Sequence, residues 1–186
     1  RYEIGSQDLE SEFANQFDVS LDYNTEHINF NVNPFYNHFQ NYIYVAPTAD
    51  FIDGYQVYIY SQASSAKTYG GEIYLHYHPH FAHRLHLEQD FSYVIGEDNN
   101  NNPLPLIPQT RINTNLKYEF AETGKKFQLK TVLLQRTQFL DKDDVATFET
   151  TSDNYEIYNI EGNFSYTGKQ TMLMKLGVRN LFNTTY

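Results

Sequence analysis

The sequence lacks several kinds of residue, and each absence narrows the class of protein. The 186 residues include no cysteine, which excludes disulfide bridges and cysteine-based zinc sites. Lysine and arginine total 13 against 23 aspartates and glutamates, and the resulting formal charge of -10 argues against a nucleic-acid partner. No apolar run reaches the length of a transmembrane helix. A membrane β-barrel stays open, because its strands need apolar residues only at every second position.

Alternation of apolar and polar residues dominates what is present. In "FDVSLDY", residues 17–23, apolar side chains fall on one face of a strand and Asp18, Ser20 and Asp22 on the other. The same period recurs along the chain, and no segment has a convincing helical period. We predict an all-β antiparallel meander of about eight strands, at 13–23, 27–45, 68–79, 82–95, 111–120, 126–139, 154–166 and 170–181. Pro34 cannot donate to a strand ladder, so we expect a β-bulge there.

The connections between the predicted strands alternate in length. Short turns follow the first, third, fifth and seventh strands, whereas the long connections are 46–67, 96–109 and 140–153. Antiparallel order then places all the short turns at one end of the sheet, as in outer-membrane barrels. The 17 tyrosines and 14 phenylalanines cluster near strand ends like the aromatic girdles of such barrels, although both residues also favour strands in general. A soluble β-sandwich that binds a glycan or protein, and a small lipocalin-like barrel, remain alternatives.

Four motifs resemble those of TonB-dependent outer-membrane receptors, and they follow one another in the family's order. The last, "LGVRNLFNTTY" at 176–186, is similar to the penultimate barrel strand of that family, with Val178, Asn180, Leu181, Phe182, Asn183 and Tyr186. The others are the Glu-x-Gly and Leu-x-x-Glu of residues 1–21, the "QASSAKTYGGE" of 62–72, and the "LPLIPQTR" of 104–111. Each motif alone is weak, but together they cover the whole chain.

The resemblance implies a function as well as a fold. The family has a 22-stranded transmembrane barrel closed by a plug domain, and it imports scarce solutes such as ferric siderophores with energy from the TonB complex. We therefore expect residues 1–186 to be the C-terminal portion of such a barrel, without the plug domain, the early strands and the final strand. Expected partners are outer-membrane lipid of a Gram-negative bacterium, the TonB complex, the protein's own plug domain and a metal chelate. No enzymatic activity and no cofactor are expected.

Several polar residues are candidates for a functional site, but none is assigned as catalytic, cofactor-binding or metal-binding. Glu72 and Glu88 lie on the polar faces of neighbouring predicted strands. They are either a catalytic pair or, as we favour, separate residues that contact a plug domain or basic side chains. Arg111 and Arg179 also lie on the predicted inner face, where they either grip an anionic siderophore or make structural contacts. The long loops 46–67, 96–110 and 140–153 are the expected surface for solute capture.

Five of the seven histidines fall between residues 76 and 86, which raises the possibility of a metal site. Period two places His76, His78 and His86 on the inner face of a hairpin, whereas His80 and His83 lie at its turn. A zinc or copper site at His76, His78 and His86 is one hypothesis. The other, which we favour, is a polar barrel lining near the periplasmic edge of the membrane.

Overall fold

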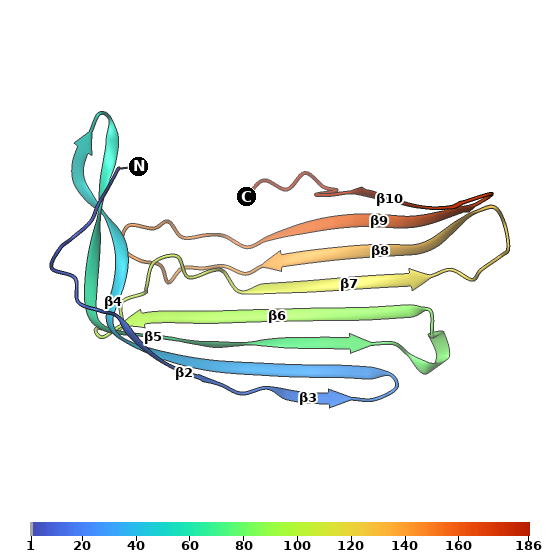
Figure 1. The fold of residues 1–186 in the computed structure, drawn as a ribbon, viewed down its shortest axis with the longest axis horizontal. Coiled ribbons are helices and arrows are strands. Elements are labelled where there is room, and N and C mark those ends of the chain that lie inside the picture. Colours follow the sequence, from blue (N-terminus) through green and yellow to red (C-terminus); the bar gives the residue numbers. More distant parts are fainter. Residues whose placement is uncertain (1) are drawn as a thin grey trace.

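The computed structural model describes residues 2–186, and they form one β-sheet (Figure 1). A single turn of 3-10 helix, η1 (His80–Ala82), is the only helix in residues 2–186, and it is too short to cross a membrane. The strands are β1 (Tyr2–Ile4), β2 (Phe13–Asp18), β3 (Leu21–Asn24), β4 (Ile28–Ile52), β5 (Tyr55–Tyr77), β6 (Leu85–Asp98), β7 (Arg111–Glu119), β8 (Phe127–Phe139), β9 (Tyr155–Thr167) and β10 (Thr171–Val178).

Strands adjacent in the chain are adjacent in the sheet. The order is β10-β9-β8-β7-β6-β5-β4-β2, with antiparallel neighbours; β3 also pairs with β4, and the short β1 pairs in parallel with β5. The sheet is a single layer whose two edges do not meet, so it is neither a two-layer sandwich nor a small closed barrel. Its buried apolar residues within 2–186 are few: Val57, Ala66, Leu104 and Ala146. The predicted antiparallel barrel segment is confirmed, and its stabilisation comes from strand pairing rather than a core.

One face of the sheet is an apolar surface open to its surroundings. Register pairing places Phe17, Tyr36 and Tyr69 side by side across β2, β4 and β5. It likewise places Val32, Ile73 and Phe91 side by side across β4, β5 and β6. Many of these side chains are exposed, including Phe17 at 66% and Leu176 at 65% of their maximum. We call this the apolar face. An exposed apolar patch that extends across a whole sheet marks contact with a membrane or a partner.

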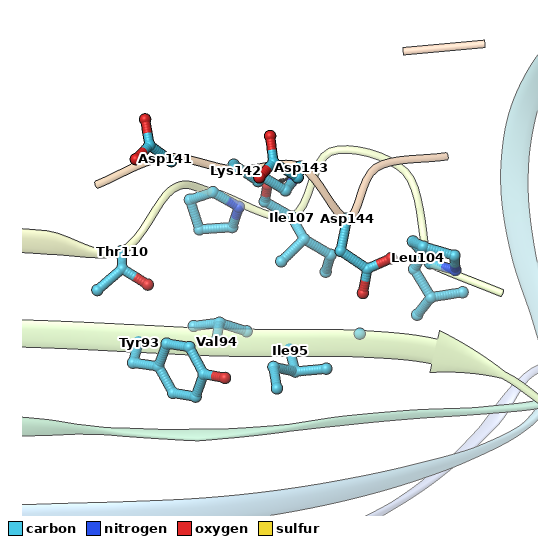
Figure 2. Close-up of a pocket in the computed structure, with 13 residues that line it drawn as sticks. Tyr93, Val94, Ile95, Leu104, Ile107, Thr110, Asp141, Lys142, Asp143 and Asp144 are labelled. Carbon is cyan, nitrogen blue, oxygen red and sulfur yellow. Dashed lines mark hydrogen bonds between the residues drawn. The ribbon is translucent and has the colours of Figure 1, made fainter. Parts of the chain in front are cut away.

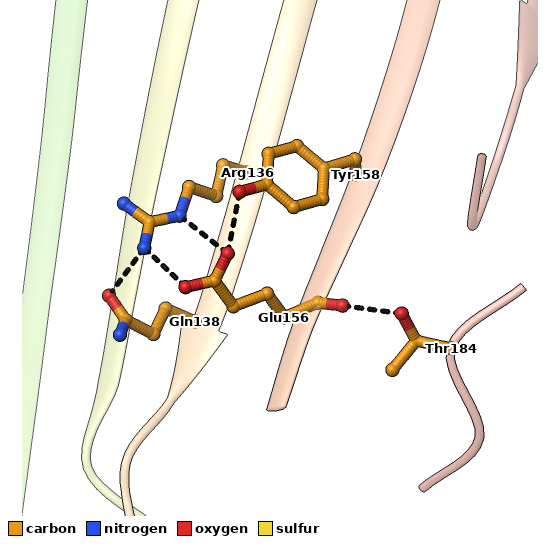
Figure 3. Close-up of polar contacts among 5 residues, drawn as sticks. All are labelled: Arg136, Gln138, Glu156, Tyr158 and Thr184. Carbon is orange, nitrogen blue, oxygen red and sulfur yellow. Dashed lines mark hydrogen bonds and ion pairs between the residues drawn. The ribbon is translucent and has the colours of Figure 1, made fainter. Parts of the chain in front are cut away.

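The apolar face ends in a polar network at the loop end of β8 and β9 (Figure 3). The Arg136 guanidinium grips the Glu156 carboxylate with Nε and Nη2, with an Nε–Oε2 distance of 3.1 Å, and Nη2 also donates to Gln138. The Tyr158 hydroxyl donates to the same carboxylate over 2.5 Å. Arg136 and Tyr158 pair one step beyond the pair Leu134 and Ile160 on this face. The switch from apolar to hydrogen-bonded charged side chains therefore marks one border of the apolar band.

Pro34 has a different effect from the one that we predicted. The register of β4 against β5 continues unchanged past the Pro34–Gly71 pair, so the expected bulge is absent there. Pro34 instead interrupts the pairing on the other side of β4. There the Val19 N–H donates to the Pro34 carbonyl, but Pro34 has no N–H that could donate back to the neighbouring strand. The predicted strand 13–23 is accordingly split into β2 and β3. The register shift between β4 and β5 lies instead between Pro47 and Phe51.

The predicted long loop 46–67 is wrong, because most of it is strand. β4 and β5 continue as a hairpin beyond the end of β6, whose last partner on β5 is Ala66, and the short β1 pairs with β5 along this part. The tip is Asp53-Gly54, with φ of 50° and 80°, the left-handed pair that a tight hairpin turn requires. Asp-Gly between Ile52 and Tyr55 is a strong local hairpin signal, and it was present in the sequence. Figure 1 shows this hairpin, β4 and β5, rising away from the sheet.

Candidate functional site

The long connections gather at one end of the sheet and the short turns at the other, as predicted (Figure 1). The segments 99–110 and 140–154 fold against each other at the loop end. Glu149 accepts the Leu106 N–H over 2.8 Å and the Ala146 N–H over 3.3 Å, and Lys142 donates to the Ile107 carbonyl. The two loops therefore form one body and not two independent flaps.

A small cavity lies beneath the joined loops, between strand β6 and the acidic segment Asp141 to Asp144 (Figure 2). Its volume is about 180 Å³, below the roughly 300–1,000 Å³ of typical ligand pockets. Leu104 and Ile107 fill the space over Gly96, where an added Cβ would lie 2.5 Å from Ile107 Cδ1. The cavity is thus a gap in the packing under the loops and is too small to hold a siderophore.

The asparagine run 99–102 has a structural role at the same end. Asp98 accepts the Asn100 and Asn102 N–H groups over 2.7 and 2.9 Å, and the Asn102 side chain adds a third bond of 2.9 Å. Partial burial raises the pKa of the Asp98 carboxyl, but these hydrogen bonds outweigh burial and hold the pKa below its ordinary value. The carboxylate therefore organises the loop that follows β6.

The face opposite the apolar face carries polar side chains on nearly every strand, and we call it the polar face. Cross-strand pairs link many of them. Asn31 donates to Asp22 over 2.6 Å, Asn159 donates to Gln135 over 2.8 Å, and Lys175 contacts Glu161 at 2.8 Å. Such a surface suits water, a polar solute or another protein domain. Apolar lipid would leave its hydrogen-bonding groups unsatisfied.

Glu72 and Glu88 lie on the polar face but not beside each other. Glu72 pairs with Ser92, four residues along β6 from Glu88, a spacing of roughly 13 Å along a strand. In glycoside hydrolases, a well-known example of a catalytic carboxylate pair, the two groups lie at most about 9.5 Å apart. Glu72 and Glu88 are therefore too far apart to act as such a pair. Glu88 instead pairs with His76 on β5 and Asn115 on β7. The two residues are separate members of the polar lining.

Arg111 and Arg179 both lie at the loop end of the polar face, yet they belong to separate places. Arg111 begins β7 opposite Ser92 and Phe139, and it is exposed. Arg179 follows β10 and lines an open groove with Gln135, Glu161 and Lys175. Since β8 and β9 lie between β7 and β10, the two guanidinium groups do not form one anion site.

The histidines gather at the turn end of the polar face, as the two-residue period predicted for His76, His78 and His86. The ring centroids of these three residues lie 5.4 Å (His76–His86), 5.6 Å (His78–His86) and 6.3 Å (His76–His78) apart. His76 Nε2 and His86 Nδ1 are 3.1 Å apart, a hydrogen-bond distance. His83 lies apart from them at the turn, with Nδ1 2.9 Å from the His80 carbonyl oxygen.

The sequence reasoning missed a further member of this group, His27. Its ring lies 5.0 Å from His78 and 5.2 Å from His80. His27 precedes β4 directly after the turn at Thr25, and His78 follows β5; the His78 N–H donates to the His27 carbonyl over 3.0 Å. The signal was available, because antiparallel pairing of the second and third predicted strands brings residue 27 to residue 78. As the side chains stand in residues 2–186, no group of three or more histidine, aspartate or glutamate residues is placed to hold a metal ion.

Comparisons with known proteins identify the fold and the family. The family described as "TonB dependent receptor-like, beta-barrel" matches residues 1–181. A comparison with curated protein sequences found no match. Solved structures with the same fold include the copper transporter OprC, with a TM-score of 0.80 and 18% identity over 96% of this chain. The FrpB iron transporter from Neisseria meningitidis (F5-1 variant) gives a TM-score of 0.70 with 16% identity over 99% of the chain.

A third similar structure is the siderophore receptor PirA from Acinetobacter baumannii, with a TM-score of 0.67 and 17% identity over 97% of the chain. The chain spans 27–29% of the length of these three structures. The resemblance inferred from four short motifs is thus confirmed. The chain belongs to the TonB-dependent receptor β-barrel family, whose members are outer-membrane transport receptors of Gram-negative bacteria and not enzymes.

Proposed function

We propose that the chain is the C-terminal portion of the barrel of a TonB-dependent receptor in a Gram-negative outer membrane. The whole receptor imports a scarce metal chelate, with a ferric siderophore as the default cargo. The early strands, the final strand and a plug domain come from the rest of the protein. The TonB complex supplies the energy.

The observation that carries this proposal is the contrast between the two faces of one single-layer sheet. The apolar face meets lipid, and its border at Arg136 and Glu156 lies at the level of the lipid headgroups. The polar face lines the lumen and contacts the plug domain. The paired loops 99–110 and 140–154 face outward and meet the solute first. The similar structures are a copper transporter, an iron transporter and a siderophore receptor, which supports a metal-bearing cargo.

The test is an uptake experiment with the full-length protein that carries this chain, expressed in a Gram-negative host without its own siderophore receptors. Iron-limited cells receive radiolabelled iron bound to a catecholate, a hydroxamate or a carboxylate siderophore. We expect accumulation of one of these chelates, and its loss when the proton-motive force is dissipated. Copper and zinc salts, given in parallel, test metal ions as alternative cargo.

The controls separate location from transport. Membrane fractionation must recover the protein in the outer membrane, and recovery in a soluble fraction would contradict the proposal. Uptake that persists without the proton-motive force would indicate a passive pore. Energy-dependent uptake of a metal-free solute, such as a glycan, would keep the receptor function but overturn the metal chelate as cargo.

A further inference from the structure

Four imidazole rings form a continuous row across the turn end of the polar face. In order they are His27, His78, His86 and His76, with successive centroid distances of 5.0, 5.6 and 5.4 Å. We call this row the histidine ladder. His27 lies just before β4, His76 lies near the end of β5, His78 follows β5, and His86 lies near the start of β6. The ladder is therefore built by tertiary pairing and not by one local motif.

Two nitrogens of the histidine ladder are buried without a hydrogen-bond partner among residues 2–186, His27 Nδ1 and His86 Nε2. The nearest carboxylate to His86 Nε2 is Glu119, at 3.8 Å, which is too long for a hydrogen bond. A buried polar group left unpaired lowers the stability of the folded state. Because His86 Nε2 has no hydrogen-bond partner in the part of the chain that the structure describes, the hydrogen bond between His86 Nδ1 and His76 Nε2 is not reinforced by a second contact that would fix the orientation of the His86 ring.

The spacing of the ladder fits a metal ion. Two imidazoles bound tetrahedrally to one ion through Zn–N bonds of about 2.0–2.1 Å hold their ring centroids roughly 5 Å apart. The pairs His76–His86 and His78–His86, at 5.4 and 5.6 Å, are close to that separation. The planes of these pairs differ by only 19° and 9°, so the rings are stacked and their nitrogens do not yet converge on one point. Rotation about the terminal side-chain torsion, which is broad for histidine, is the adjustment required.

We propose that the histidine ladder binds one divalent transition-metal ion of the zinc or copper type. His76 Nε2 and His86 Nδ1, now 3.1 Å apart, chelate the ion, and His78 supplies a third nitrogen after its ring rotates. Neutral imidazole is a preferred ligand of both ions. The fourth position is left to water or to a group of the plug domain. This inference goes beyond the proposed function, because a metal bound here need not be the transported cargo.

The experiment measures metal binding and leaves transport aside. The full-length protein is purified in detergent, its affinity tag is removed, and a chelator strips bound metal. Zinc binding is then followed by calorimetry, and copper(II) binding by electron paramagnetic resonance, in which the nitrogen splitting reports the number of bound imidazoles. We expect one ion per chain, with two or three nitrogen ligands.

Variants assign the site to the ladder. His76→Ala and His86→Ala should each weaken binding by at least about tenfold, the lower end of the effect of losing even a supporting residue of a metal site. His83→Ala is the matched control, because it removes an imidazole from the same hairpin but outside the ladder. Heat-dependent gel mobility confirms that each variant is folded. Absence of binding by the wild type, or equal affinity in wild type, His76→Ala and His86→Ala, would overturn the proposal.

Discussion

At the scale of single residues, neighbours in a strand of this protein meet opposite environments. Ile73 lies on the apolar face between Val32 and Phe91, whereas Glu72 lies on the polar face between Asn33 and Ser92. Both side chains are exposed in the sheet itself, Ile73 at 38%. The exposed fraction of a side chain alone therefore does not distinguish the apolar face from the polar face. Under the proposed function the two faces meet different solvents, because lipid on one side accepts isoleucine and water on the other side accepts glutamate.

This contrast predicts unequal effects of the same new charge. Ile73→Lys places an ammonium near the middle of the lipid-facing band and should lower the free energy of unfolding by about 2–4 kcal/mol. Glu72→Lys, one residue earlier, should change it much less, because its side chain faces the lumen. Urea unfolding of the full-length protein in lipid vesicles measures both. Equal effects of the two substitutions would mean that the apolar face does not contact lipid.

At the scale of elements, the C-terminal motif that carried the family resemblance is a turn held by asparagines. Asn180 has a left-handed φ of 49°, accepts the Thr184 N–H over 2.8 Å and donates to the Thr184 carbonyl over 3.0 Å. Its own N–H donates to the Asn159 side chain on β9 over 2.9 Å. The Thr184 hydroxyl donates to the Glu156 carbonyl, also drawn in Figure 3. The motif thus ends β10 and returns the chain to β9.

We expect Asn180→Ala to loosen this segment. The substitution removes two hydrogen bonds and places alanine in a left-handed conformation, at a combined cost of about 1–3 kcal/mol. Asn183→Gly is the control, because Asn183 has a φ of 52° that glycine adopts freely, and its N–H bond to the Asn180 carbonyl is retained. Limited proteolysis of the full-length protein after β10 provides the measurement. Similar cleavage rates for wild type and Asn180→Ala would show that the turn does not depend on this side chain.

At the scale of the whole molecule, the sheet has two free edges and almost no core. β10 is exposed along its entire length and pairs only with β9 within residues 2–186, and β2 and β3 pair only with β4. Unpaired strand edges promote association with other strands. The apolar face adds a second surface that avoids water. Under the proposed function we therefore expect the stability of this sheet to depend on strands that pair with its edges and on lipid against the apolar face.

The isolated 186-residue chain should accordingly fail to form a discrete monomer. In buffer without detergent we expect it to aggregate through its edges and its apolar face. In detergent we expect mixed oligomers, since detergent covers the face but leaves the edges unpaired. Size-exclusion chromatography with light scattering measures the outcome, with the full-length protein in the same detergent as the control. A folded monomer in plain buffer would contradict the membrane assignment.

Alternation along the chain was by itself sufficient to predict most of the strands, their antiparallel order and the two faces. The reason is that side-chain period and connection length are local properties of a strand. Alternation missed β1, the division of 13–23 into β2 and β3, and the strands within 46–67. The tertiary structure decided features that depend on pairing between strands. Pairing of β4 with β5 made most of residues 46–67 a projecting hairpin. Pro34 interrupts the pairing on the other side of β4, between β2 and β3, and not the pairing with β5. Pairing also places His27 beside His78. A residue's partner across the sheet is set by the register of the two strands, which the turn between them and the apolar pattern of both strands fix together, and not by its own identity.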